Sequence, residues 1–126
     1  MKTYKKPVVT VDAGMAEGVY AASGAKGTLN VTYYGVWDRW GTNGGKALAM
    51  ADWSGINGTI TLNITFNDTL EQVETDDASV QESWSGKTAT LTFASTATNP
   101  LTIGVHIDHG VSIDDLKMTG FTYSVN

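Results

Sequence analysis

Residues 56–66 of the chain read Ile56-Asn57-Gly58-Thr59-Ile60-Thr61-Leu62-Asn63-Ile64-Thr65-Phe66. Large apolar side chains occupy alternating positions of this stretch, and threonine or asparagine stands between them. Successive side chains of a β-strand point to opposite faces, so the stretch predicts a strand with one buried face and one solvated face. The side chains predicted to be buried are Ile56, Ile60, Leu62, Ile64 and Phe66.

The same alternation recurs on both sides of this stretch. It predicts a buried face at Leu29, Val31, Tyr33 and Trp37, at Ala89, Leu91 and Phe93, and at Leu101, Ile103, Val105 and Ile107. In the last segment the apolar side chains change from one set of alternate positions to the other at Gly120, which predicts a β-bulge there. Trp37 continues an apolar face, and we therefore expect its ring in the core.

Turn signals such as Asn43-Gly44-Gly45, Ser85-Gly86 and Asn99-Pro100 separate these segments. The acidic stretch from Asp68 to Glu82 reads as pieces of strand and loop. Roughly six to eight short, one-faced strands can bury their apolar sides only against each other. The sequence therefore predicts an all-β fold, namely a two-sheet antiparallel β-sandwich of immunoglobulin-like, Greek-key or jelly-roll type.

Composition limits the classes of partner. The chain has 126 residues, enough for one core, and a formal net charge of −5. Such a protein lacks the basic surface that neutralises phosphates, so we expect no nucleic-acid partner. It contains no cysteine, which excludes disulfides, and no apolar run long enough to span a membrane.

The first 27 residues differ from the rest in composition, so we divide the chain into an N-terminal segment, 1–27, and a sandwich domain, 28–126. The segment begins with basic residues and continues with small ones, and its apolar run is too short for a standard signal peptide. Ala22-Ser23-Gly24-Ala25 looks similar to the processing sites of bacterial leader peptides. A flexible extension, or an edge strand at Val8 to Val11, is the alternative. An exported bacterial protein would be extracellular or attached to the cell surface.

Tryptophans near turns are the candidate ligand contacts, because an exposed aromatic face stacks on the apolar face of a sugar while nearby polar groups bind its hydroxyls. The predicted ligand-binding residues are Trp40, Trp53, Arg39, Asp52 and Trp84. The alternative for each ring is that it caps the end of the core.

Other chemistry has little support in the sequence. His106, Asp108 and His109 include metal-ligating types but no further ligand is placed beside them, and the acidic residues Glu71 to Asp77 lack the spacing of a calcium loop. No motif for a catalytic nucleophile, a metalloprotease or phosphate binding occurs. We therefore predict no metal, no cofactor and no enzymatic activity.

Three stretches resemble family 2 of the carbohydrate-binding modules, which are cellulose- and xylan-binding β-sandwiches. They are Trp40-Gly41-Thr42, the stretch from Ile56 to Phe66, and Ser83-Trp84-Ser85-Gly86 with the strands that follow, Thr88 to Phe93 and Thr102 to Val105. Thr59 stands where the family has a strand tryptophan. Of the family's binding aromatics, only Trp40 carries over.

The resemblance implies a non-catalytic module that binds a polysaccharide or another glycan. The alternative is a protein–protein module, adhesin-like or self-assembling, that uses a sheet face or an edge strand to bind a protein partner or a second copy of the chain.

Overall fold

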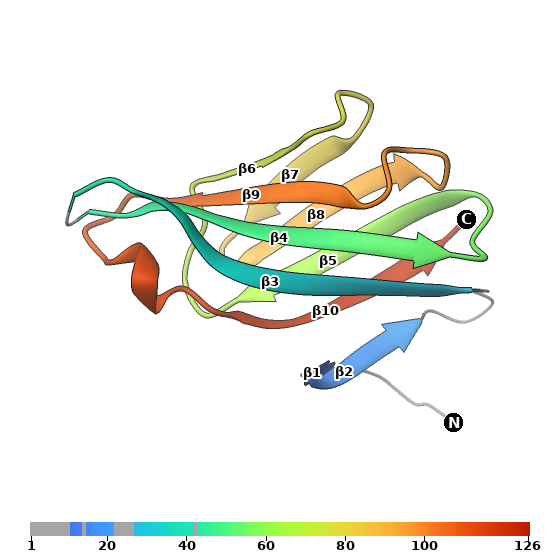
Figure 1. Cartoon of the computed structure of the whole chain (residues 1–126), viewed down its shortest axis with the longest axis horizontal. Helices are drawn as coiled ribbons and strands as arrows, with labels where there is room; N and C mark the ends of the chain where they lie inside the picture. Colours follow the sequence, from blue (N-terminus) through green and yellow to red (C-terminus); the bar gives the residue numbers. More distant parts are fainter. Residues whose placement is uncertain (1–10, 14, 22–26, 42) are drawn as a thin grey trace.

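The computed structural model describes residues 11–13, 15–21, 27–41 and 43–126 of the chain, and side-chain positions from residue 27 onward. These residues form β-strands and one short 3₁₀ helix (Figure 1). The strands are β1 (Val11–Ala13), β2 (Met15–Ala21), β3 (Thr28–Arg39), β4 (Gly45–Ser54), β5 (Thr59–Phe66), β6 (Gln72–Thr75), β7 (Gln81–Ser85), β8 (Thr88–Ala94), β9 (Leu101–Ile107) and β10 (Met118–Val125); the helix is η1 (Ile113–Asp115).

The strands form two sheets that pack face to face. One sheet has the order β1-β2-β10-β5-β8-β7 and the other has the order β3-β4-β9-β6. In Figure 1 the four-stranded sheet lies in front of the other. All strand pairs are antiparallel except β2 with β10. The predicted all-β, two-sheet sandwich is confirmed.

The stretch from Ile56 to Phe66 supplies the central strand β5, which begins at Thr59 rather than at Ile56. Its predicted apolar face is buried: Ile60, Leu62, Ile64 and Phe66 are at most 1% exposed. On the neighbouring strand, Leu91 lies opposite Leu62. Burial of each such side chain contributes about 1.5–3 kcal/mol relative to its exposure, so this face stabilises the sandwich strongly.

The predicted bulge in the last strand is also confirmed. Met118 pairs with Phe66 and Gly120 pairs with Thr65, so one extra residue lies between them on β10. The extra residue changes the positions that face the core, and Phe121 and Tyr123 are buried as a result.

Strand β3 contains two further bulges that the sequence analysis missed. Tyr33 and Gly35 pair with the adjacent residues Ala49 and Leu48, which leaves Tyr34 as an extra residue. Trp37 is the extra residue of the second bulge, between Val36 and Asp38. The alternation that predicted a buried Trp37 is therefore broken, and the prediction is wrong: the Trp37 side chain is 59% exposed.

At the N-terminus, β2 pairs in parallel with β10, Val19 opposite Phe121 and Ala21 opposite Tyr123. Val11, the last residue of the predicted edge strand, begins β1. Val8 to Thr10 and the leader-like site at 22–25 lie outside the described residues, and the division of the chain at residue 27 stays a prediction. Within the described part of the chain, no helix is long and apolar enough to cross a membrane.

Candidate functional site

Three exposed aromatic side chains, which we call the aromatic strip, follow one another on β3 and just after its end: Tyr34, Trp37 and Trp40. On β4 the alanines at 47 and 49 are buried, whereas Lys46 and Leu48 point outward. The bulges on β3 place Tyr34 next to Gly35, which pairs with Leu48, and Trp37 next to Asp38, which pairs with Lys46, and both rings are exposed. Tyr34 is 60% exposed.

Trp40 continues the strip just beyond the end of β3. Its ring meets the ring of His106, an outward residue of β9, edge to face with 5.4 Å between centroids. Its indole Nε1 donates a hydrogen bond of 3.2 Å to Asp38. The ring is 38% exposed and is held on two sides, so it is presented to solvent in a defined orientation.

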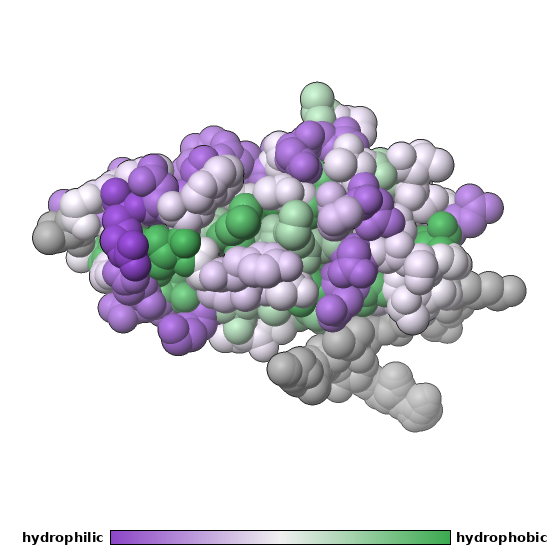
Figure 2. Space-filling view, in the orientation of Figure 1, coloured by the Kyte–Doolittle hydropathy of each residue, from purple (hydrophilic) through white to green (hydrophobic). Residues whose placement is uncertain are grey.

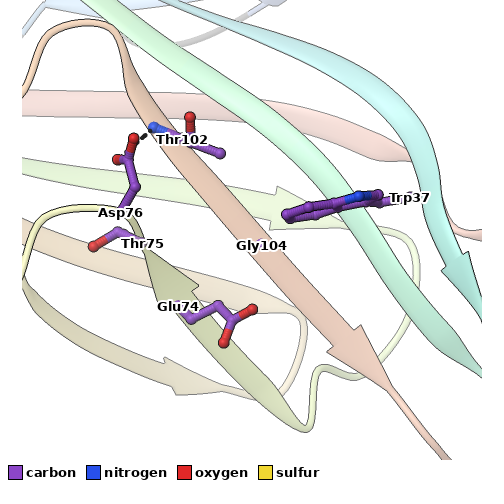
Figure 3. Close-up of a pocket in the computed structure, with 6 residues that line it drawn as sticks. All are labelled: Trp37, Glu74, Thr75, Asp76, Thr102 and Gly104. Carbon is purple, nitrogen blue, oxygen red and sulfur yellow. Dashed lines mark hydrogen bonds between the residues drawn. The ribbon is translucent and has the colours of Figure 1, made fainter.

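A shallow hollow of about 110 Å³ lies beside Trp37. Trp37 reaches from β3 over β4 and forms one wall, as Figure 3 shows. The remaining lining comes from β6, the residue after it and β9: Glu74, Thr75, Asp76, Thr102 and Gly104. Figure 2 shows the face of the molecule that bears the hollow, where hydrophobic residues lie exposed among hydrophilic ones.

Gly104 keeps the hollow open. It lies between Leu48 of β4 and Glu74 of β6, at an outward position of β9. A Cβ atom at Gly104 would lie 3.2 Å from Cγ of Glu74, which is closer than an ordinary contact. Any larger side chain at this position would therefore displace Glu74 or fill the space beside Trp37.

Lys46 connects the two walls of the hollow. Its Nζ atom lies 4.7 Å from the centre of the Trp37 ring and 2.7 Å from Oε2 of Glu74. The hydrogen bond from Lys46 holds the pKa of Glu74 below its usual value, and His106 acts in the same direction. His106 Nε2 lies 3.2 Å from the same oxygen without making a hydrogen bond to it.

Asp76 is the second carboxylate of the hollow. One of its oxygens accepts a hydrogen bond of 3.0 Å from the backbone N–H of Thr102, and its own N–H donates to the Thr102 carbonyl. In the part of the chain that the structure describes, Asp76 forms no ion pair. Its other oxygen thus adds an uncompensated negative charge and a hydrogen-bond acceptor to the hollow.

The predicted site residues do not lie together. The expectation of an exposed ring at Trp53 is wrong, because this residue is only 7% exposed. Its ring lies 5.0 Å from that of Phe93, centroid to centroid, and its Nε1 donates a hydrogen bond to the carbonyl of Ser95. It points inward on β4 and caps the end of the core, which was the alternative interpretation. Trp84 is 40% exposed but lies on β7, in the other sheet.

The other predicted residues lie in the four-stranded sheet or just beyond the end of β3. Trp40 is part of the aromatic strip. Arg39, beside it, donates two hydrogen bonds to Asp114, at 3.1 and 2.7 Å, and joins the strand end to η1. Asp52 is exposed on the outer side of β4, three outward positions from Lys46. Their roles in binding stay predictions.

The sequence did not point to Tyr34, Trp37, Glu74, Asp76 or Gly104 as ligand contacts: Trp37 was expected in the core, and the two carboxylates were considered only as calcium ligands. One signal for the first two was present, because an isolated glycine inside an alternating strand, here Gly35, often marks a bulge. Its φ of 88° is a left-handed conformation that favours glycine. The carboxylates and Gly104 are brought to Trp37 only by the order of the strands in the sheet.

The two histidines considered as metal ligands lie in separate clusters. His106 contacts Trp40 and Glu74, whereas His109 lies between two carboxylates, Nδ1 at 2.8 Å from Glu71 and Nε2 at 3.1 Å from Asp68. No group of three or more metal-ligating side chains is arranged to hold an ion among the residues that the structure describes.

Comparison of the chain with protein-family models, with curated proteins and with solved structures finds no match.

Proposed function

We propose that this domain is a non-catalytic module that binds carbohydrate on the aromatic strip, with Trp37 as its principal stacking residue. The observation that carries the proposal is the Trp37 ring itself, 59% exposed at the side of a hollow whose other walls are polar. A soluble domain gains stability by burying such a ring, so its exposure in a held position favours a binding role.

The chemistry of the hollow suits a sugar. The apolar C–H face of a pyranose stacks on an aromatic ring, while its hydroxyls need hydrogen-bond partners at the edge. Glu74 and Asp76 are acceptors for such hydroxyls, and Thr102 has a hydroxyl that both donates and accepts. These groups lie across the hollow from Trp37.

The length of the strip favours an extended ligand. Tyr34, Trp37 and Trp40 are three residues apart in sequence, and a strand rises about 3.3 Å per residue, so neighbouring rings start at most about 10 Å apart along the backbone. Different units of one linear glycan can contact rings at that separation. This supports an oligosaccharide or polysaccharide rather than a single sugar.

The carboxylates of the hollow support binding rather than hydrolysis. A glycoside hydrolase needs one carboxyl group with a raised pKa to act as the general acid. Glu74 has the opposite shift, because its pKa is lowered by the hydrogen bond from Lys46. It is therefore ionised at neutral pH and serves as an acceptor.

The direct test is retention on insoluble polysaccharides together with a glycan array, for the full chain and for Trp37→Ala. We expect the variant to lose affinity about tenfold or more, as truncation of a central aromatic contact does. Trp84→Ala is the comparison, because Trp84 is also exposed but lies on the other sheet. No retention on any glycan, or equal losses for both variants, would contradict the proposal.

A second candidate is self-assembly or binding of a protein partner through β7. All five residues of this strand are exposed, and among the strands that the structure describes it pairs only with β8, which leaves its outer edge open to another strand. Light scattering separates the candidates: an oligomer that grows with protein concentration and is unaffected by sugars supports the second.

A polysaccharide ligand implies an extracellular or cell-surface location, which fractionation of native cells and mass spectrometry of the N-terminus would test.

A further inference from the structure

We propose that the glycan carries free amino groups, and that the hollow beside Trp37 holds the ammonium group of a sugar stacked on that ring. This inference rests on the proposed carbohydrate-binding function. It adds a class of ligand, the partly or fully de-N-acetylated amino-sugar polymers, to which nothing in the sequence pointed.

The charge of the hollow favours a cation. Lys46 and Glu74 neutralise each other at 2.7 Å, which leaves the carboxylate of Asp76 to set the sign of the charge. Asp38 and Asp52 add negative charge to the same outer face, from β3 and β4. The whole chain has a formal charge of −5, so the long-range field also attracts cations and repels sugars that carry carboxylates or phosphates.

Hydrogen-bonding capacity leads to the same ligand class. A carboxylate only accepts hydrogen bonds, and an ammonium group only donates them, with three N–H bonds to share. An acetamido group at the same carbon would bring an acceptor oxygen and an apolar methyl toward Asp76. A hydroxyl can donate one hydrogen bond but brings no charge. The ammonium form is therefore the best match to the second oxygen of Asp76, which accepts no hydrogen bond from the residues that the structure describes.

Trp37 also tolerates a cation nearby. Lys46 already lies over one face of the ring at 4.7 Å, and the attraction of an ammonium group to an indole face is of this kind. The opposite face is then the one on which a sugar stacks. Asp76 lines the same hollow as Trp37 and is the carboxylate that would receive an ammonium group at the edge of that sugar.

Three linear β-1,4-linked pentasaccharides test the inference, because they share a backbone and differ only at C2. Cellopentaose carries a hydroxyl, chitopentaose an acetamido group and the glucosamine pentamer an ammonium group. We would titrate each into the full chain by calorimetry, at low salt and at a pH where the amine is protonated. We expect the glucosamine pentamer to bind about two- to fivefold more tightly than cellopentaose, the effect of one exposed ion pair.

Two variants with the same change in net charge locate the effect. Asp76→Asn should abolish the preference for the glucosamine pentamer and leave the affinity for cellopentaose within about twofold. Asp115→Asn, in the exposed η1 on another part of the surface, should keep the preference. Raising the ionic strength to about 1 M should also reduce the preference, because the Debye length falls to about 3 Å.

The outcomes are distinguishable. If cellopentaose binds at Trp37 and the glucosamine pentamer binds equally or less tightly, the amino-sugar inference is overturned while the carbohydrate-binding proposal stands. If no pentasaccharide binds, the amino-sugar inference is overturned, and the carbohydrate-binding proposal falls with it only where the polysaccharide and glycan-array tests also show no retention. If only the glucosamine pentamer binds, and Trp37→Ala has no effect on it, the binding is adsorption to an acidic surface and both are overturned.

Discussion

The ammonium group of Lys46 lies 4.7 Å from the centre of the Trp37 ring, so one cation contacts the exposed aromatic side chain of β3 directly. The same group is 2.7 Å from Glu74 on β6. Lys46 thereby joins the two walls of the hollow.

Replacing Lys46 by methionine should raise the pKa of Glu74 toward its ordinary value. Methionine keeps an apolar stem beside Trp37 but removes the hydrogen bond that lowers this pKa. A carboxyl group whose pKa is lowered by folding stabilises the folded state at pH values above its pKa in the unfolded chain. That contribution is lost as the pH falls through the pKa of the folded state. An NMR titration of the Glu74 carboxyl in both proteins measures the shift, and Lys117→Met is the control. The same Glu74 pKa in both proteins would contradict the conclusion that Lys46 lowers it.

Replacing Gly104 by valine should close the hollow. The added Cβ meets Cγ of Glu74 at 3.2 Å, and the two methyl groups occupy the space beside Trp37. We expect glycan affinity to fall about tenfold or more, with the domain still folded. Gly120→Val is the matched control, since a Cβ there has no neighbour within 4 Å and the residue lies in the other sheet. Equal affinities of the two variants would show that the hollow does not contact the ligand.

Thermal stability should fall as pH rises above the pKa of an ordinary histidine, because of His109. Hydrogen bonds to Glu71, and then to Asp68, raise the pKa of His109. A raised pKa stabilises the folded state fully below the unfolded value, near 6.5, and this contribution disappears as pH rises through the folded value. The melting temperature between about pH 5.5 and 8.5 measures the effect. His109→Gln should flatten this part of the curve, and an equal slope in the variant would refute the role.

Truncation of Leu62 to alanine should destabilise the domain by about 2–5 kcal/mol, because the side chain is fully buried between the sheets and leaves a cavity. Thr61→Ala, one residue earlier on the outer face of β5, should cost about 1 kcal/mol or less. Urea unfolding of both variants gives the comparison. Similar free energies of unfolding would mean that the two faces of β5 are not buried as described.

The strands could be predicted from sequence because each has one apolar face. The alternation at Ile60, Leu62 and Ile64 predicted which side chains are buried, and the change of positions at Gly120 predicted a bulge. The exposure of Trp37 and that of Trp53 were predicted wrongly for different reasons. At Trp37 a bulge interrupts the alternation, whereas Trp53 keeps the alternation of β4 but was judged by its polar neighbours, Asp52 and Ser54.

The sequence by itself determined that this chain is a two-layer β-protein, because side chains of a strand must alternate and apolar faces must leave water. Only the tertiary structure decided which side chains form the candidate site. Trp37, Gly104 and Glu74 come from three strands far apart in the chain, and they meet because β3, β4, β9 and β6 are neighbours in one sheet. Strand order depends on the packing of the whole sandwich, and local alternation does not specify it.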